Sequence, residues 1–170
     1  YNEPYLIQHI EDLQGNRLFE HYYQGVQQFL PDSLFPLLNM MQGVIQRGTG
    51  RIVRRMGFKH PAAGKTGTTN DFKDAWFNGF TKDISASVWV GFDNNESMQT
   101  KSGKGLTGAS AAAPIWVHFM QKALEGKNPV NFPVPEKIKF ATVDVQTGYL
   151  AQEFSLETLQ VAVKEDVDLS

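Results

Sequence analysis

Six residues in the middle of the chain, Gly64 to Thr69, combine groups that could act on an anionic or amide-bearing ligand. Lys65 supplies a compact positive charge, and the hydroxyls of Thr66 and Thr68 can donate and accept hydrogen bonds. Two glycines let a backbone or a ligand approach closely. Because side chains alternate along an extended segment, Lys65 is predicted to share a face with Gly67 and to oppose the two threonines. The stretch therefore predicts a site rather than part of a core.

The Gly-Lys-Thr within this stretch also ends the phosphate-binding loop of many nucleotide-binding proteins. That pattern requires a glycine at position 59, where this chain has Lys59. The phosphate loop also follows a buried strand and opens a helix, whereas residues 58–61 are not strand-like and residues 76–80 are typical of a strand. These departures argue against phosphate binding.

Lys-Thr-Gly is also the third motif of the serine acyl-transfer enzymes that react with penicillin. Three more motifs follow it in order: Asp74-Ala75-Trp76-Phe77, Val88-Trp89-Val90-Gly91-Phe92-Asp93 and Ala111-Ala112-Ala113-Pro114-Ile115-Trp116. With them, the chain resembles the C-terminal part of the transpeptidase domain of a bifunctional (class A) penicillin-binding protein. The resemblance extends over roughly residues 5 to 150.

The resemblance implies that Lys65 is catalytic, supplying positive charge and helping proton movement near a serine nucleophile. It implies that Thr66 and Thr68 bind the terminal carboxylate of the substrate, and that Gly67 keeps the strand surface open. The backbone N–H of Thr68 would then be one oxyanion donor. The implied partners are peptidoglycan stem peptides, β-lactam inhibitors and the remainder of the parent protein, with no cofactor and no metal.

The family's first two motifs, Ser-x-x-Lys and Ser-x-Asn, do not occur in this sequence. Because a nucleophile needs an adjacent base, we expect the chain to be inert alone and to belong to a D,D-transpeptidase or carboxypeptidase whose serine lies in a preceding segment. The alternative is a non-catalytic module of the same origin that binds peptidoglycan or a partner. The resemblance also implies an upstream glycosyltransferase domain and a location on the extracytoplasmic face of the bacterial cytoplasmic membrane, anchored outside this chain.

The overall composition is that of an ordinary globular protein, with 41% hydrophobic residues among 170. The net charge of −2 gives no field of the kind that nucleic-acid binding requires. The chain has no cysteine, so it has no disulfide and no Cys-based metal site. No apolar run approaches the ~18 residues of a membrane span, so we expect no membrane contact by this segment.

The first third of the sequence predicts a β-hairpin formed by residues 5–12 and 17–23. A helix is predicted next, capped by Asp32 or Ser33 and ending at Arg47 and Gly48. Its expected buried face consists of Leu34, Leu37, Leu38, Met41 and Ile45. A basic loop follows that contains Arg47, Arg51, Arg54, Arg55 and Lys59, and it is either a solvated surface or a rim that attracts a carboxylate-bearing substrate.

Residues 62–93 predict three antiparallel strands, because the links between them are too short for a parallel crossover. Their aromatic residues, Trp76, Phe77, Phe80 and Trp89, are expected to pack against helices, with stacking against a substrate as the alternative. Residues 103–108 form a G-x-G-x-x-G pattern, but ten polar or small residues separate it from the preceding strand, which argues against a dinucleotide site.

A helix over residues 110–124 is apolar almost all round, which predicts burial on more than one side with His118 inside the core. After the prolines of residues 129–135, a hairpin is predicted between residues 138–145 and 149–150, followed by an exposed acidic tail. The expected fold class is α+β, an antiparallel sheet backed by helices, incomplete in this chain. We divide it into the end of a transpeptidase domain (1–126) and a linker, hairpin and tail (127–170).

Overall fold

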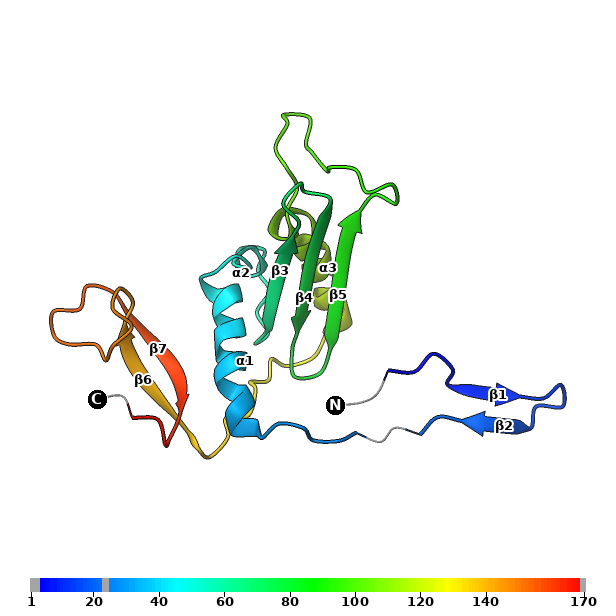
Figure 1. The fold of residues 1–170 in the computed structure, drawn as a ribbon, viewed down its shortest axis with the longest axis horizontal. Coiled ribbons are helices and arrows are strands. Elements are labelled where there is room, and N and C mark those ends of the chain that lie inside the picture. The colour runs from blue at the N-terminus through cyan, green and yellow to red at the C-terminus, as the bar shows by residue number, and fades with distance from the viewer. Residues whose placement is uncertain (1–3, 23–24, 169–170) are drawn as a thin grey trace.

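The computed structural model describes residues 4–22 and 25–168. The described residues form three antiparallel sheets, three α-helices and one π-helical turn. The three-stranded sheet and the helices beside it make up the body of the molecule, and a hairpin lies at each end of the chain (Figure 1). This arrangement confirms the predicted α+β class with antiparallel sheets.

The central sheet consists of β3 (Ala63–Thr68), β4 (Asp74–Phe80) and β5 (Ser85–Gly91) in the order β3-β4-β5. Its register pairs Thr66 with Phe77, and Phe77 with Val88. Residues that pair directly point to the same face of a sheet, so these three side chains share one face. The strand that carries the Lys-Thr-Gly motif is therefore an edge strand of the meander, as the short links predicted.

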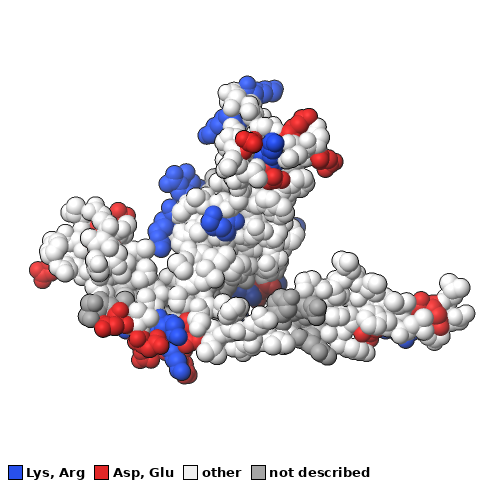
Figure 2. Space-filling view, viewed as in Figure 1, with Lys and Arg blue, Asp and Glu red and all other residues white. Residues whose placement is uncertain are grey.

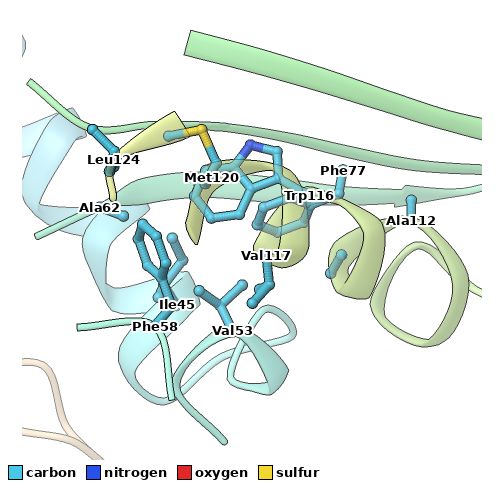
Figure 3. Close-up of a cluster of buried hydrophobic side chains, with 11 residues drawn as sticks. Ile45, Val53, Phe58, Ala62, Phe77, Ala112, Trp116, Val117, Met120 and Leu124 are labelled. Atoms are coloured by element: carbon cyan, nitrogen blue, oxygen red, sulfur yellow. The ribbon is translucent and has the colours of Figure 1, made fainter. Parts of the chain in front are cut away.

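The Phe77 face of the sheet is covered by α3 (Ala113–Ala123) and forms the core, as Figure 3 shows. The fully buried indole of Trp116 packs edge-on against Phe77 and Phe58, with ring centroids 5.2 and 5.3 Å away. Its Nε1–H donates to the carbonyl oxygens of Gly79 and Ala86, at 3.2 and 3.1 Å. This single side chain thus binds the helix to two strands by both packing and hydrogen bonding.

The opposite face of the sheet carries Trp76 and Trp89, which pair across β4 and β5. They remain 40% and 42% exposed, so the prediction that they pack against helices is wrong. Their rings instead lie against each other, with centroids 6.3 Å apart. The indole N–H of Trp89 also donates to a carboxylate oxygen of Asp74. The prediction fails because side chains alternate along a strand, so Trp76, next to the buried Phe77, points to the other face together with its partner Trp89.

Helix α1 (Pro31–Gln46) begins with Leu30 as its N-cap and makes no side-chain cap hydrogen bond, so neither Asp32 nor Ser33 caps it. Asp32 is instead buried in the first turn, with the ammonium of Lys164 3.9 Å away. The predicted buried face is correct for Ile45, whereas Leu34 and Leu37 are exposed. The short helix α2 (Ile52–Arg55) follows after a tight loop.

The π-helical turn η1 (Gly108–Ala112) precedes α3, so the two together begin two residues before the predicted helix. The side chain of Thr107 caps η1 by accepting from the Ser110 N–H, and the hydroxyl of Ser110 accepts from the Thr107 N–H in return. Contrary to the prediction, α3 is buried on one face only: Ile115, Phe119 and His118 are exposed. His118 is therefore not a core histidine.

The two terminal hairpins are separate small sheets. Strands β1 (His9–Glu11) and β2 (Arg17–Glu20) extend away from the body in Figure 1 and are shorter than predicted. At the other end, β6 (Ile138–Asp144) pairs with β7 (Thr158–Lys164). Residue Leu150, the expected partner, makes only a single bridge to Val143, and seven residues of the predicted tail form strand β7.

The β6-β7 hairpin packs on α1 rather than lying free. The amide of Asn39 accepts from the N–H of Ala162 at 3.1 Å, and Phe35 contacts Phe140 edge-on at 6.3 Å. Among the described residues, no helix has the length and apolar character needed to cross a membrane.

Candidate active site

Strand β3 separates the side chains of the Lys-Thr-Gly motif onto two faces of the sheet. Lys65 pairs with Asn78, and Gly67 pairs with Trp76, on the exposed face. Thr66 and Thr68 lie on the opposite face, at the edge of the core. The predicted alternation is confirmed, and it gives the strand a cation on one side and two hydroxyls on the other.

The Lys65 side chain is exposed, and its ammonium donates to the carbonyl oxygen of Thr66 at 2.9 Å. This contact uses one of the three hydrogen atoms that an ammonium can donate. The ammonium can therefore still donate to a ligand or to another side chain at the exposed face of β3.

Thr66 has a partner that the sequence did not reveal. Its Oγ1 lies 2.7 Å from Oγ1 of Thr49, in the loop between α1 and α2. This loop closes tightly on the end of α1, because the N–H groups of Gly48 and Gly50 donate to the carbonyls of Gly43 and Val44. The sequence shows Thr49 as a hydroxyl between two glycines. Only the tertiary fold brings this hydroxyl to Thr66, seventeen residues away.

Thr68 also has a partner that the sequence did not reveal. Its Oγ1 accepts the N–H of Gly108 at 3.0 Å, so the hydrogen of the hydroxyl remains available to another acceptor. A Cβ at position 108 would lie 2.2 Å from the carbonyl oxygen of Trp76 and 2.6 Å from that of Gly67. Only glycine fits here, so the last glycine of the G-x-G-x-x-G pattern packs η1 onto β3 and β4.

The backbone of β3 presents donors at the free edge of the sheet. The N–H of Thr69 donates to Asp74 of β4 at 3.1 Å. Because successive N–H groups of a strand point in opposite directions, the N–H of Thr68 points away from β4. It can therefore donate to an extended ligand laid along the edge, or to an oxyanion.

Arg54 of α2 binds the segment that leads into β3. Its guanidinium donates to the carbonyl oxygens of Phe58 and His60, at 2.7 and 2.8 Å. Burial lowers the pKa of Arg54, but a guanidinium starts so high that it stays charged at neutral pH. Arg54 thus turns inward and is not part of a solvated basic surface.

A metal-dependent site needs clustered ligands, and the residues that the structure describes contain no group of three His, Asp or Glu suited to a metal. The side chains gathered at β3 are instead hydroxyls, an ammonium and backbone donors, which suit recognition of a carboxylate and a peptide backbone.

The chain is similar to proteins of a known family. The family model described as the penicillin binding protein transpeptidase domain matches residues 1–121. The chain is 43% identical over 113 residues to penicillin-binding protein 1A of Pseudomonas aeruginosa, covering 66% of this chain and 13% of that protein. It is 34% identical over 139 residues to penicillin-binding protein 1A of Rickettsia conorii, covering 78% of this chain and 17% of that protein. The chain thus spans less than a fifth of the length of these relatives.

Solved structures show the same similarity. The crystal structure of penicillin-binding protein 1A from Haemophilus influenzae aligns with 94% of this chain and 29% of its own, at a TM-score of 0.69 and 25% identity. The PonA1 protein of Mycobacterium tuberculosis in complex with penicillin V aligns with 75% of this chain and 35% of its own, at a TM-score of 0.57 and 28% identity.

Proposed function

Because the chain belongs to the family of penicillin-binding protein transpeptidase domains, we propose that it supplies the substrate-binding strand of a peptidoglycan D,D-transpeptidase. The observation that carries the proposal is the arrangement of β3. Two hydroxyls on one face are hydrogen-bonded to Thr49 and Gly108, an ammonium lies on the other face, and a backbone N–H points to the free edge. We also propose that residues 1–126 belong to that domain and that residues 127–170 are an addition at its C-terminal end.

The proposed reaction has two steps. A serine outside this chain attacks the carbonyl carbon between the last two D-Ala residues, an ester forms, and the terminal D-Ala leaves as an amine that carries the proton from the serine. An amine of a neighbouring stem peptide then attacks the ester carbonyl. The new amide bond replaces the ester bond, and the proton released by that amine returns to the serine oxygen.

Thr66 and Thr68 would bind the terminal carboxylate of the stem peptide. The hydroxyl of Thr68 already accepts from Gly108, so its own hydrogen can be donated to a carboxylate oxygen. Gly67 leaves the exposed face of β3 open beside Trp76, and the N–H of Thr68 would donate to the oxyanion. One such donor contributes a factor of about 10²–10³ in rate.

Lys65 would act as the charged group beside the serine. Its ammonium stabilises negative charge and assists proton transfer, provided that the missing segment brings the nucleophile to the exposed face of β3. The chain alone would therefore be inert, and β-lactams would acylate only the complete domain. The parent protein would work on the extracytoplasmic face of the cytoplasmic membrane, anchored outside this chain.

The test is acylation by a fluorescent penicillin, measured on the full-length protein that contains this chain. Lys65→Ala is expected to lower the acylation rate at least about 100-fold, because it removes the group that assists proton transfer. Thr66→Val is expected to lower the rate about 10- to 100-fold, because it removes a hydrogen bond to the carboxylate of penicillin. Thr142→Val, on the exposed side of β6, is the matched control and should acylate normally. Normal acylation by both site variants would contradict the assignment.

The 170-residue chain by itself should form no covalent adduct with penicillin, and an adduct would contradict the proposed inertness. If the full-length protein also forms none but still binds peptidoglycan, the chain belongs to a non-catalytic binding module of the same fold.

A further inference from the structure

Beside β3 lies an open groove with a volume of about 780 Å³, formed by the loop after α1, by α2 and by residues 104–110. Its charged lining residues are all cations: Arg47, Arg51, Arg55 and Lys104. The chain as a whole carries a net charge of −2, so this concentration of positive charge is local. Figure 2 shows Lys and Arg without acidic residues between them on the flank where α1 meets α2.

Among the residues that the structure describes, the four cations form no ion pair with an acidic side chain. Within residues 4–22 and 25–168, the ion pairs involve other residues, and none includes a cation of the groove. Cations gathered in a concave surface raise the local concentration of anions and attract them over a distance of about 10 Å. The groove is therefore suited to a ligand that carries carboxylates.

One of these cations is held in place by packing. The guanidinium of Arg47 lies against Gly43 of α1, where a Cβ would come within 2.8 Å of its nitrogen. A glycine inside a helix is less favourable than an alanine. The guanidinium of Arg47, which lines the groove, occupies the space that Gly43 leaves open.

The groove adjoins both threonines of β3. Thr49, which lines the groove, hydrogen-bonds to Thr66. Ala109 and Ser110 line it from η1, whose first residue, Gly108, donates to Thr68. The groove thus begins where the terminal carboxylate of the donor peptide would bind.

We propose that this cationic groove binds the acceptor stem peptide, the second substrate of transpeptidation, through its carboxylates. The inference rests on the proposed function. The acceptor amine must reach the acyl carbon from the position that the leaving D-Ala amine vacated. That D-Ala is held by its carboxylate at Thr66 and Thr68, so the body of the acceptor must extend from the same side, where the groove lies.

The chemical step requires nothing beyond the two substrates. The nitrogen of the acceptor forms a bond to the acyl carbon, the ester bond to the serine breaks, and the amine proton passes to the serine oxygen. Water can take the place of the amine, in which case the product is the hydrolysed peptide. The groove would therefore decide between cross-linking and hydrolysis without affecting the first acylation.

The test compares two charge-matched triple variants of the full-length protein. The groove variant carries Arg51→Gln, Arg55→Gln and Lys104→Gln, and the control carries Lys59→Gln, Lys82→Gln and Lys127→Gln, all at exposed positions. Arg47 is left intact because its guanidinium packs on α1. The measurements are the rate of penicillin acylation, the ratio of cross-linked to hydrolysed product, and the KM for a soluble acceptor stem peptide.

The groove variant should acylate like the wild type, while its KM for the acceptor rises and its ratio of cross-linked to hydrolysed product falls, each about fivefold. The control should change neither quantity. An unchanged KM and product ratio in the groove variant would overturn the inference and leave the proposed function standing. Absence of acylation in the wild type would overturn the proposed function and the acceptor groove together.

Discussion

The side-chain oxygens of Thr49 and Thr66 lie 2.7 Å apart and join the loop after α1 to the strand that carries the Lys-Thr-Gly motif. The bond has a consequence for the hydroxyl of Thr66, which has one hydrogen and two acceptor sites. If Thr49 donates, the hydrogen of Thr66 is directed to a ligand at the edge of β3. The loop would thereby help to prepare the proposed carboxylate site at Thr66, which it does not itself contain.

Replacing Thr49 by valine keeps the shape of the side chain and removes this hydrogen bond. We expect penicillin acylation of the full-length protein to slow about 3- to 10-fold, the equivalent of one hydrogen bond of about 0.5–1.5 kcal/mol. Thr49→Ser keeps the hydroxyl and should acylate at nearly the wild-type rate. Equal rates for the valine variant and the wild type would show that Thr66 needs no such partner.

Gly108→Ala should disturb the junction between η1 and β3. The added methyl group would meet the carbonyl oxygens of Trp76 and Gly67 at 2.2 and 2.6 Å, so the turn must move and its hydrogen bond to Thr68 is lost. We expect a loss of about 1–3 kcal/mol in the free energy of unfolding, measured by urea denaturation with tryptophan fluorescence. Ala109→Ser, the control one residue further, should change the free energy by less than about 0.5 kcal/mol.

Arg54→Met should loosen the entry into β3, because the carbonyls of Phe58 and His60 lose a charged donor. The expected loss in the free energy of unfolding is about 1–3 kcal/mol. The exposed Arg55→Met on the same helix serves as the control and should have little effect. If the two variants are equally stable, the two hydrogen bonds of Arg54 contribute nothing to the fold.

The turn after β6 should respond to acid. Hydrogen bonds from the Thr147 N–H and the Ser155 side chain lower the pKa of Asp144 below its usual value. Its carboxylate therefore stabilises the turn above that usual value, and the stabilisation is lost as the pH falls through the lowered pKa. In an NMR titration, the amide signals of Gln146 and Thr147, which donate to Asp144, should shift as the pH falls below about 4. Asp144→Asn should abolish these shifts, and an unchanged titration would contradict the assignment.

Local patterns predicted much of the central structure. Alternating residues and short links gave the three strands of residues 62–93 and the two faces of the Lys-Thr-Gly strand, because strand periodicity and hairpin connections depend on neighbouring residues. The same patterns indicated the helix before these strands, the helix after them and the fold class. The motifs Lys-Thr-Gly and Asp-Ala-Trp-Phe, with the two motifs that follow them, indicated the family.

Contacts between distant parts of the chain were decided only by the tertiary structure. Thr49 of the loop after α1 and Gly108 of η1 meet the two threonines of β3 from 17 and 40 residues away, separations that no periodicity encodes. The tertiary structure also decided that β6 pairs along its length with β7 and makes only a single bridge to the nearer Leu150, because the β6-β7 hairpin packs on α1 through Asn39 and Phe35. Side-chain type and local spacing thus determined which groups could act at the site. The packing of remote segments decided which groups orient the threonines of β3. It also decided on which side of the strand the cationic groove lies.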